Sequence, residues 1–325
     1  MSTPVELVDV PMGASRTDIG NALSDHLRHF AATHKPSVIH CVGLPAAAGA
    51  LFGTRGQVPI VVEPGATAAQ RARDLERPTA ASALLDRVAQ EDAILQRAHR
   101  VIARTPLEAA TLVKRGVPTE RTLVVPEGLV DFELDTSSMT ELPVLGTVVL
   151  DEGDVDVSLL AAALERIRQP WRLMVFFDPG VTSGADLSRQ FERALQARIE
   201  YIAIDKLNLW RLTSLRIMVT PIRAGRMLSS GAYIPESVVW GLKLERPTVM
   251  PDSGSPRLIA GAGGIYYRAD DPGHLAEWIE RLLADGEAGQ NAYAEARAQA
   301  ARCGWSQAEA LIKGLWVELL PNNHY

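Results

Sequence analysis

The sequence is poor in cysteine and holds no long apolar run. Its 325 residues include two cysteines, Cys41 and Cys303, which excludes a disulfide framework and a cysteine-rich metal site. The most apolar stretch, residues 38–53, is interrupted by a histidine and a proline, so it is too short to span a bilayer. The first ten residues contain two acidic side chains and do not match a secretory leader. We therefore expect a cytoplasmic protein.

An excess of positive charge is also missing. Lys and Arg number 33 against 39 Asp and Glu, which gives a formal net charge of −6. This balance disfavours nucleic acid as a partner, because binding a duplex requires a concentrated basic face. The seven histidines are scattered and show no three-ligand metal spacing. No G-x-S-x-G nucleophile elbow is present either. We expect no metal site.

The sequence does contain a regular alternation of short apolar runs with longer amphipathic segments. A chain that is 47% hydrophobic and 22% charged has enough apolar material for two buried cores, and its length favours two domains. The apolar runs carry Val and Ile on consecutive positions, which is typical of parallel strands covered by helices. In the first half of the chain, the predicted strands are 6–10, 38–42, 60–62, 100–103 and 122–125.

A polar stretch at 131–143 interrupts this alternation and predicts an interdomain linker. Beyond the linker a helix is predicted over 185–198, and the predicted strands are 144–150, 172–177, 199–203, 215–219, 247–250 and 264–267. Two successive α/β domains of this kind place ligands at the carboxyl ends of their strands.

Four local signatures follow the order found in a known family. They are PSVIHCVG (36–43), the segment 98–130 with its G-x-P and VVPEGLV, the segment 246–285 beginning RPTVMPDSGSP, and CGWSQAEALI (303–312). Their order and spacing resemble the family-4-type (group 1) retaining glycosyltransferases of the GT-B fold. The resemblance implies an α/β protein with two Rossmann-like domains whose parallel sheets face each other across a cleft.

The resemblance also implies domain boundaries and a ligand. Residues 1–133 correspond to the acceptor-side domain, shortened because Met1 starts one or more βα units later than in the family. Residues 134–304 correspond to the donor-side domain, and a terminal helix within 305–325 is expected to pack back on the first domain. The implied ligand or substrate is a nucleotide diphosphate sugar, and no resident cofactor is implied.

The donor site departs from the family pattern at its cations. The family uses no metal; an Arg and a Lys in G-R-L-x-x-x-K-G supply the countercharge to the diphosphate. Aligning this signature on LGTVVLDEGDV places Thr147 at the Arg position and Glu152 at the Lys position. A carboxylate there repels a diphosphate by roughly a few kcal/mol at a partly exposed site.

The carboxylates of the family's E-x7-E signature are missing as well. Their positions fall on Ala232 and Trp240, and an indole cannot accept hydrogen bonds from sugar hydroxyls. Glu236 lies one helical turn from Trp240 and serves as a fallback if the register is shifted. In the family's G-G-x-P-E turn, Gly254 is retained and Arg257 replaces the Glu.

Other residues offer replacements whose roles the sequence leaves open. Arg223 and Arg226 follow the strand 215–219 and either rebuild a phosphate clamp, with Arg257 or Lys206, or form a solvated loop. His40 at a strand end either acts as a base toward an acceptor or orients its loop.

Two hypotheses follow for function. The first is a degenerate glycosyltransferase homologue that has lost or impaired sugar transfer and serves as a binding or scaffolding protein, as a homodimer or beside a partner glycosyltransferase. The alternative is an active, divergent retaining glycosyltransferase that transfers a sugar from a nucleotide-sugar donor. Fold alone does not decide between them, because function resides in the site.

Overall fold

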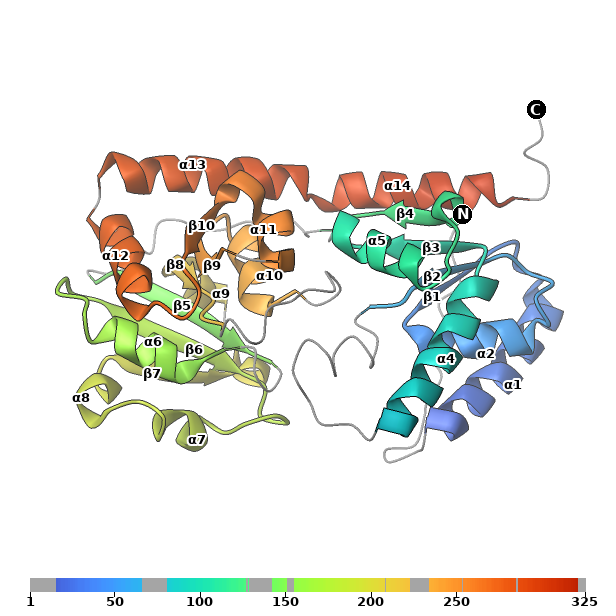
Figure 1. Ribbon diagram of the computed structural model, residues 1–325, viewed down its shortest axis with the longest axis horizontal. Coiled ribbons are helices and arrows are strands. Elements are labelled where there is room, and N and C mark those ends of the chain that lie inside the picture. The colour runs from blue at the N-terminus through green and yellow to red at the C-terminus, as the bar shows by residue number, and fades with distance from the viewer. Residues whose placement is uncertain are drawn as a thin grey trace. The chain divides into compact units, whose positions relative to one another are not determined.

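The computed structural model (Figure 1) divides the chain into two compact units. Unit 1 contains Met1–Arg73, Arg77–Val125 and Glu309–Tyr325, and unit 2 contains the remainder, chiefly Pro126–Ala308. The structure describes residues 16–65, 81–126, 128, 142–150, 155–207, 209–222, 234–252, 254–284 and 286–320.

Unit 1 is built on a four-stranded parallel sheet with the strand order β1-β2-β3-β4. Most of its strand residues are Val, Ile or Ala, and the central strands are buried, as expected for a parallel sheet covered by helices. The strands are β1 (Ile39–Val42), β2 (Ile60–Glu63), β3 (Arg100–Ala103) and β4 (Thr122–Val124); the helices are α1 (Arg16–His34), α2 (Leu44–Gly53), α4 (Ala81–Arg97) and α5 (Pro106–Lys114).

Unit 2 is built on a six-stranded parallel sheet with the order β10-β9-β8-β5-β6-β7. Its strands are β5 (Val144–Val149), β6 (Arg172–Phe177), β7 (Ile199–Ala203), β8 (Leu215–Val219), β9 (Thr248–Pro251) and β10 (Gly264–Tyr267). Its helices are α6 (Val157–Leu164), α7 (Gly184–Ser188), α8 (Arg193–Gln196), α9 (Leu209–Thr213), α10 (Glu236–Lys243), α11 (Gly254–Ala260), α12 (Pro272–Leu283) and α13 (Glu287–Arg302). Helix α14 (Trp305–Glu318) starts in unit 2 and continues into unit 1.

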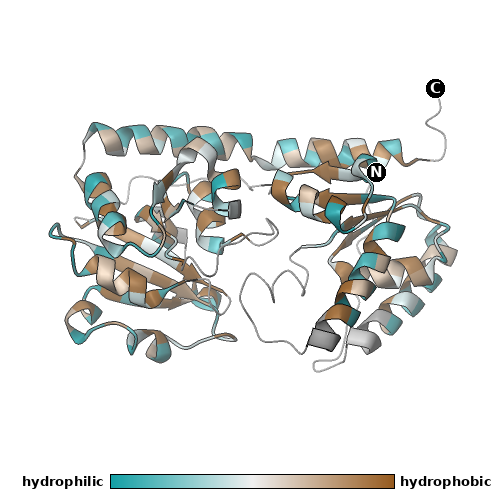
Figure 2. Ribbon diagram, in the orientation of Figure 1, coloured by the Kyte–Doolittle hydropathy of each residue, from teal (hydrophilic) through white to brown (hydrophobic). Residues whose placement is uncertain are grey.

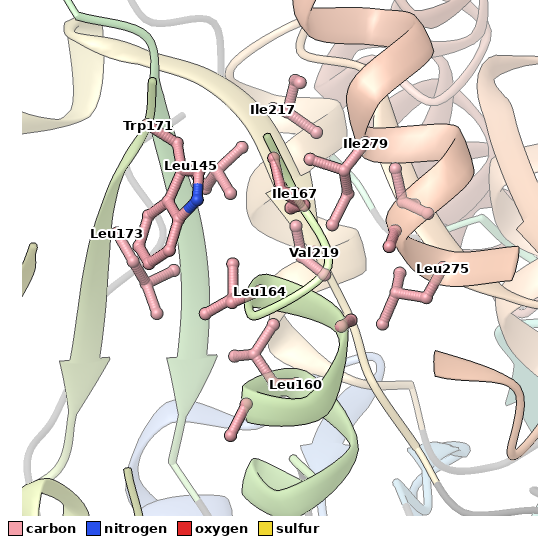
Figure 3. Close-up of a cluster of buried hydrophobic side chains, with 14 of the residues drawn as sticks. Leu145, Leu160, Leu164, Ile167, Trp171, Leu173, Ile217, Val219, Leu275 and Ile279 are labelled. Carbon is pink, nitrogen blue, oxygen red and sulfur yellow. The ribbon is translucent and has the colours of Figure 1, made fainter. Parts of the chain in front are cut away.

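The largest core of unit 2 lies between its sheet and the helices α6 and α12. Figure 3 shows aliphatic side chains from these elements, with the buried Trp171 at one side of the cluster by Leu145 and Leu173. Figure 2 shows strands that are mostly hydrophobic and helices on which hydrophobic and hydrophilic residues alternate. The residues of this core that are labelled in Figure 3 are Leu145, Leu160, Leu164, Ile167, Trp171, Leu173, Ile217, Val219, Leu275 and Ile279.

The predicted strands from 38 to 125 and from 144 to 267 are confirmed as two parallel sheets, whereas the predicted strand 6–10 lies outside the described residues. The single helix predicted over 185–198 is wrong: α7 and α8 replace it. Phe191 between them is buried, so the chain turns to bring this ring into the core. The predicted linker lies outside the described residues, apart from its last two positions.

Two glycines of α2 allow α1 to pack against it. A Cβ at Gly49 would lie 2.7 Å from the Leu23 Cβ, and a Cβ at Gly53 would lie 2.6 Å from the Ser24 carbonyl oxygen. Real Cβ atoms do not approach so closely, and the backbone of α1 cannot move aside as a flexible side chain can. The absence of side chains at these positions therefore sets the distance between the two helices.

We expect Gly53→Ala to destabilise unit 1 by about 1–3 kcal/mol, because the added methyl group overpacks the α1–α2 contact. Urea unfolding monitored by circular dichroism measures the change. Gly314→Ala in α14 is the matched control, since nothing lies within 4 Å of the added atom; it should stabilise the helix by about 1 kcal/mol. Equal effects of the two substitutions would contradict the packing argument.

His99 makes the stability of unit 1 depend on pH. The Ile60 N–H donates to His99 Nδ1 at 3.1 Å, which requires an unprotonated Nδ1. Burial, helped by the charges of Arg121 and Arg100, lowers the pKa of His99. The unfolded chain therefore binds the extra proton more readily than the folded unit.

The stabilisation from neutral His99 should be complete above the ordinary histidine pKa of about 6.5 and be lost as the pH falls through the lower folded-state value. Urea unfolding on either side of this range measures the loss. His99→Asn, which keeps an acceptor but does not titrate there, should show a smaller loss. An unchanged pH profile in that variant would assign the dependence to other groups.

Candidate functional site

At the carboxyl edge of the unit 2 sheet, helix α10 begins where two neighbouring strands separate. Pairing between β5 and β8 ends at Gly146 and Met218. Beyond that point the Val148 N–H donates to Ser237 Oγ of α10 at 3.0 Å. The buried Ser237 hydroxyl thus replaces a strand partner, and α10 begins where β5 and β8 separate. The N-terminus of α10 is therefore part of the edge where ligands of such folds bind.

Thr147, at the predicted cation position, lies inside β5 opposite Val175 of β6. Its side chain is 0% exposed, and alternation along the strand puts it on the same face as Leu145 and Val149, which belong to the main core. In the described part of the chain, its Oγ1 has no hydrogen-bond partner. Thr147 is a core residue.

Glu236 and Trp240, the two candidates on α10, are placed differently. Glu236 is the first residue of the helix and is half-buried at the carboxyl edge. Trp240 packs against Phe176 of β6, with ring centroids 5.4 Å apart, and extends the apolar clusters beneath the helix. The indole therefore holds α10 to the sheet. Of the two side chains, Glu236 is the one at the helix start, on the carboxyl edge.

Arg257 and Gly254 lie on α11, after β9. Gly254 has a φ of 53°, in the left-handed region that favours glycine. The Arg257 guanidinium is paired with Asp252 and lies 4.7 Å above the Tyr266 ring. Arg257 therefore has a carboxylate partner, in a pair whose side chains are both more than half exposed.

The structure does not bring Lys206 and Arg257 together. Lys206 follows β7, whereas Arg257 follows β9, and three strands of the sheet separate these two. Four interstrand steps correspond to about 19 Å between the strand ends, which is too far for contact with one phosphate. Glu152, Arg223 and Arg226 lie outside the described residues.

A cluster that sequence reasoning missed lies on unit 1. His40 Nε2 of β1 is 3.0 Å from Glu63 Oε1 at the end of β2, and the His40 ring contacts Trp316 of α14 edge-on, with centroids 5.7 Å apart. His40 holds the pKa of Glu63 below its usual value despite partial burial, and the charge of Arg104 adds to this. Glu63 is thus an ionised partner of His40.

The neighbouring residue Arg104 is fixed by the start of α5. Thr105 Oγ1 accepts the Glu108 N–H at 3.0 Å, and Glu108 Oε2 accepts the Arg104 N–H at 2.7 Å. These bonds satisfy amides at the helix start. A sequence signal for this cluster existed, because His40 lies within the first of three consecutive predicted strands, and Glu63 and Arg104 directly follow the other two.

Residues 2–128 match the family described as glycosyl transferase 4-like domain. Among solved structures, a sucrose-phosphate synthase from Thermosynechococcus elongatus is similar with a TM-score of 0.72 and 18% identity, over 96% of this chain and 80% of that one. A glycosyltransferase from Rickettsia africae has a TM-score of 0.72 and 10% identity, over 98% of this chain and 85% of that one. Anabaena HepE in complex with UDP has a TM-score of 0.71 and 15% identity, over 91% of this chain and 82% of that one. No curated protein matches the sequence.

These similarities establish the fold. The fold is that of the GT-B glycosyltransferases. The predicted resemblance to family-4-type (group 1) glycosyltransferases is confirmed. Within the described ranges, no helix is long and apolar enough to cross a membrane, and no group of three or more His, Cys, Asp or Glu residues could hold a metal ion.

Proposed function

We propose that this protein is a glycosyltransferase homologue in which sugar transfer from a nucleotide sugar is impaired or lost. We propose that it acts instead as a scaffold that binds another protein chain. The observation that carries the proposal is the burial of Thr147. The residue aligned with the family's cation position is 0% exposed inside β5.

The chemical argument concerns the leaving group. A nucleoside diphosphate gains negative charge as the glycosidic bond breaks, and fixed cations or donors at such a position are usually the largest contribution to catalysis; losing one donor costs about 10²–10³-fold in rate. In this chain Thr147 has no charge to offer, and Arg257 is shared with Asp252. Trp240 is used in packing against Phe176. These contacts at three positions implied by the resemblance support the proposal.

The binding role we propose is that of a scaffold, either as a homodimer or beside a partner glycosyltransferase that contacts the N-terminal domain. Native mass spectrometry of the purified full chain, before and after affinity capture from its own host, tests this role. A defined stoichiometry supports it, and a monodisperse monomer with no co-purifying protein opposes it.

The alternative is an active, divergent retaining glycosyltransferase. Glu236 favours this alternative, because it begins α10 at the carboxyl edge and is half-buried. HepE, of similar fold, has also been solved with UDP-glucose. In this alternative, Arg223 and Arg226 supply the countercharge and Glu236 contacts the sugar.

Donor turnover separates the two functions. We expect purified protein to release no uridine or guanosine diphosphate from the corresponding sugar nucleotides beyond the background of the Glu236→Gln variant. The control is Arg189→Ala, an exposed residue directly after α7. Nucleoside diphosphate release that is abolished by Arg223→Ala or Arg226→Ala, but kept by this control, would establish the active enzyme instead.

A further inference from the structure

Five exposed arginines gather at the amino edge of the unit 2 sheet, the end opposite to the start of α10. Arg172 begins β6 and Arg198 directly precedes β7. The Leu173 N–H donates to the Arg198 carbonyl oxygen at 3.0 Å, so these two arginines lie at adjacent strand starts. The other three lie in the connection from α6 to β6 and at the start of α8. We call this set the arginine patch: Arg166, Arg168, Arg172, Arg193 and Arg198.

The arginine patch has no carboxylate partners among the described residues. Glu200 of β7, close to the patch, is paired with Arg211 instead. Glu280 Oε1 contacts the connection from α6 to β6, but it accepts the Arg168 backbone N–H at 2.7 Å and not a guanidinium hydrogen. The five guanidinium groups are therefore open to an external anion.

This grouping of positive charge is unusual for the chain. The segments 165–172 and 192–198 hold the five arginines and two glutamates, in a protein whose formal net charge is −6. Elsewhere exposed arginines are paired, as Arg28 is with Asp25. Grouped like charges repel one another, and a bound anion removes this repulsion.

The arginine patch also rests on a fixed base. The Arg198 guanidinium lies 5.3 Å from the centroid of the Trp171 ring, and Trp171 is buried in the main core of unit 2. The Arg172 N–H donates to the Pro143 carbonyl oxygen at 3.0 Å. Because the backbone and one guanidinium are already held, less conformational freedom is lost when a ligand binds.

The composition of the patch favours carboxylate groups of a protein as the ligand. The planar guanidinium fork binds carboxylates through two parallel hydrogen bonds. The large apolar side chains of the two segments, Ile167, Trp171 and Leu195, are buried, so they offer nothing to insert into a bilayer. They also present no exposed aromatic ring on which a nucleic-acid base could stack.

We propose that the arginine patch binds an acidic segment of a partner protein chain. The proposal rests on the scaffold role proposed above and specifies the chemistry of the partner. Because the patch lies at the amino edge of the sheet, this binding is separate from any ligand at the carboxyl edge.

Fluorescence anisotropy of a labelled deca-glutamate peptide, titrated with the purified full chain, tests the proposal. The wild type is compared with the double variant Arg168→Gln/Arg172→Gln, whose substituted side chains are exposed and make no described contact. We expect about three- to tenfold weaker binding at low salt, as the loss of two exposed ion pairs implies. The affinity of the wild type should fall with added salt more steeply than that of the variant.

The matched control is Arg55→Gln/Arg97→Gln in unit 1, which changes the net charge by the same amount at two exposed arginines without a described carboxylate partner. It should bind the peptide as the wild type does. Equal weakening in both double variants would overturn the proposal, because net charge alone would then explain the binding. No binding by the wild type would also overturn it, as would tighter binding to phosphatidylserine vesicles or to a DNA duplex than to the peptide.

Hydrogen exchange locates the bound peptide. We expect slower exchange in residues 165–173 when the peptide is present, and slowing confined to other segments would contradict the proposal. Donor turnover, measured on the same double variant, keeps this result separate from the proposed function. Turnover together with peptide binding at the patch would refute the loss of sugar transfer and leave the patch in place, whereas neither turnover nor peptide binding would refute the patch alone.

Discussion

Arginine at position 147 will unfold unit 2 instead of creating a phosphate-binding cation. Thr147 is fully buried between Leu145 and Val149 of the same face, and it has neither space nor a carboxylate partner for a guanidinium. Burying an unpaired charge together with a larger side chain costs about 4 kcal/mol or more. Urea unfolding of Thr147→Arg, followed by tryptophan fluorescence, measures this loss.

The matched control is Thr147→Val, which keeps the shape and removes the hydroxyl. Because Oγ1 is buried without a described partner, its removal should leave stability unchanged or raise it by about 1 kcal/mol. A stable Thr147→Arg protein that gains affinity for UDP would contradict the assignment of Thr147 to the core. A large loss of stability in Thr147→Val would do so as well.

Loss of Arg115 will destabilise unit 1 more than loss of any surface ion pair. Its Nε lies 2.6 Å from Asp92 Oδ1 and its terminal nitrogen 3.1 Å from Glu91 Oε2, so it joins the end of α5 to α4. Glu91 is 8% exposed. Removing Arg115 weakens the charge compensation of a buried carboxylate, and Arg115→Ala should cost about 3 kcal/mol, the low end for a buried pair because Arg87 still lies 4.0 Å from Glu91.

The comparison for Arg115 is Arg28→Ala on α1, where both partners of the ion pair are exposed, at 59% and 73%. Exposed pairs contribute about 0–1 kcal/mol, so this substitution should have a small effect. Chemical unfolding of the two variants under the same conditions decides the point. Similar losses would mean that burial does not set the strength of the Arg115 pairs.

Most of the fold could be predicted because the signals are local. Consecutive Val and Ile residues mark the parallel strands, and the spacing of the apolar runs gives two α/β units. Thr147 shows the limit of motif alignment. The run VLGTVV already indicated a strand buried on both faces, yet alignment with the family placed one of its residues at the donor site. In this case the hydrophobic pattern was the better guide.

The cluster on unit 1 shows what the sequence could not give. His40 lies in one predicted strand and Glu63 directly follows the next, so their proximity could be inferred from a parallel pairing. Trp316 is distant in sequence and reaches His40 only because α14 returns to unit 1. The side of the sheet that a terminal helix covers depends on tertiary packing, which no local pattern encodes.

Calorimetric titration of the purified full chain with UDP and with GDP tests the central claim most directly, because it asks whether the donor site still holds a nucleoside diphosphate. We predict no heat beyond dilution at millimolar nucleotide, and correspondingly no rise in melting temperature, since a ligand bound by the folded state alone must stabilise it. Saturable binding with a micromolar Kd, weakened by Glu236→Gln or Arg223→Ala, would contradict the account.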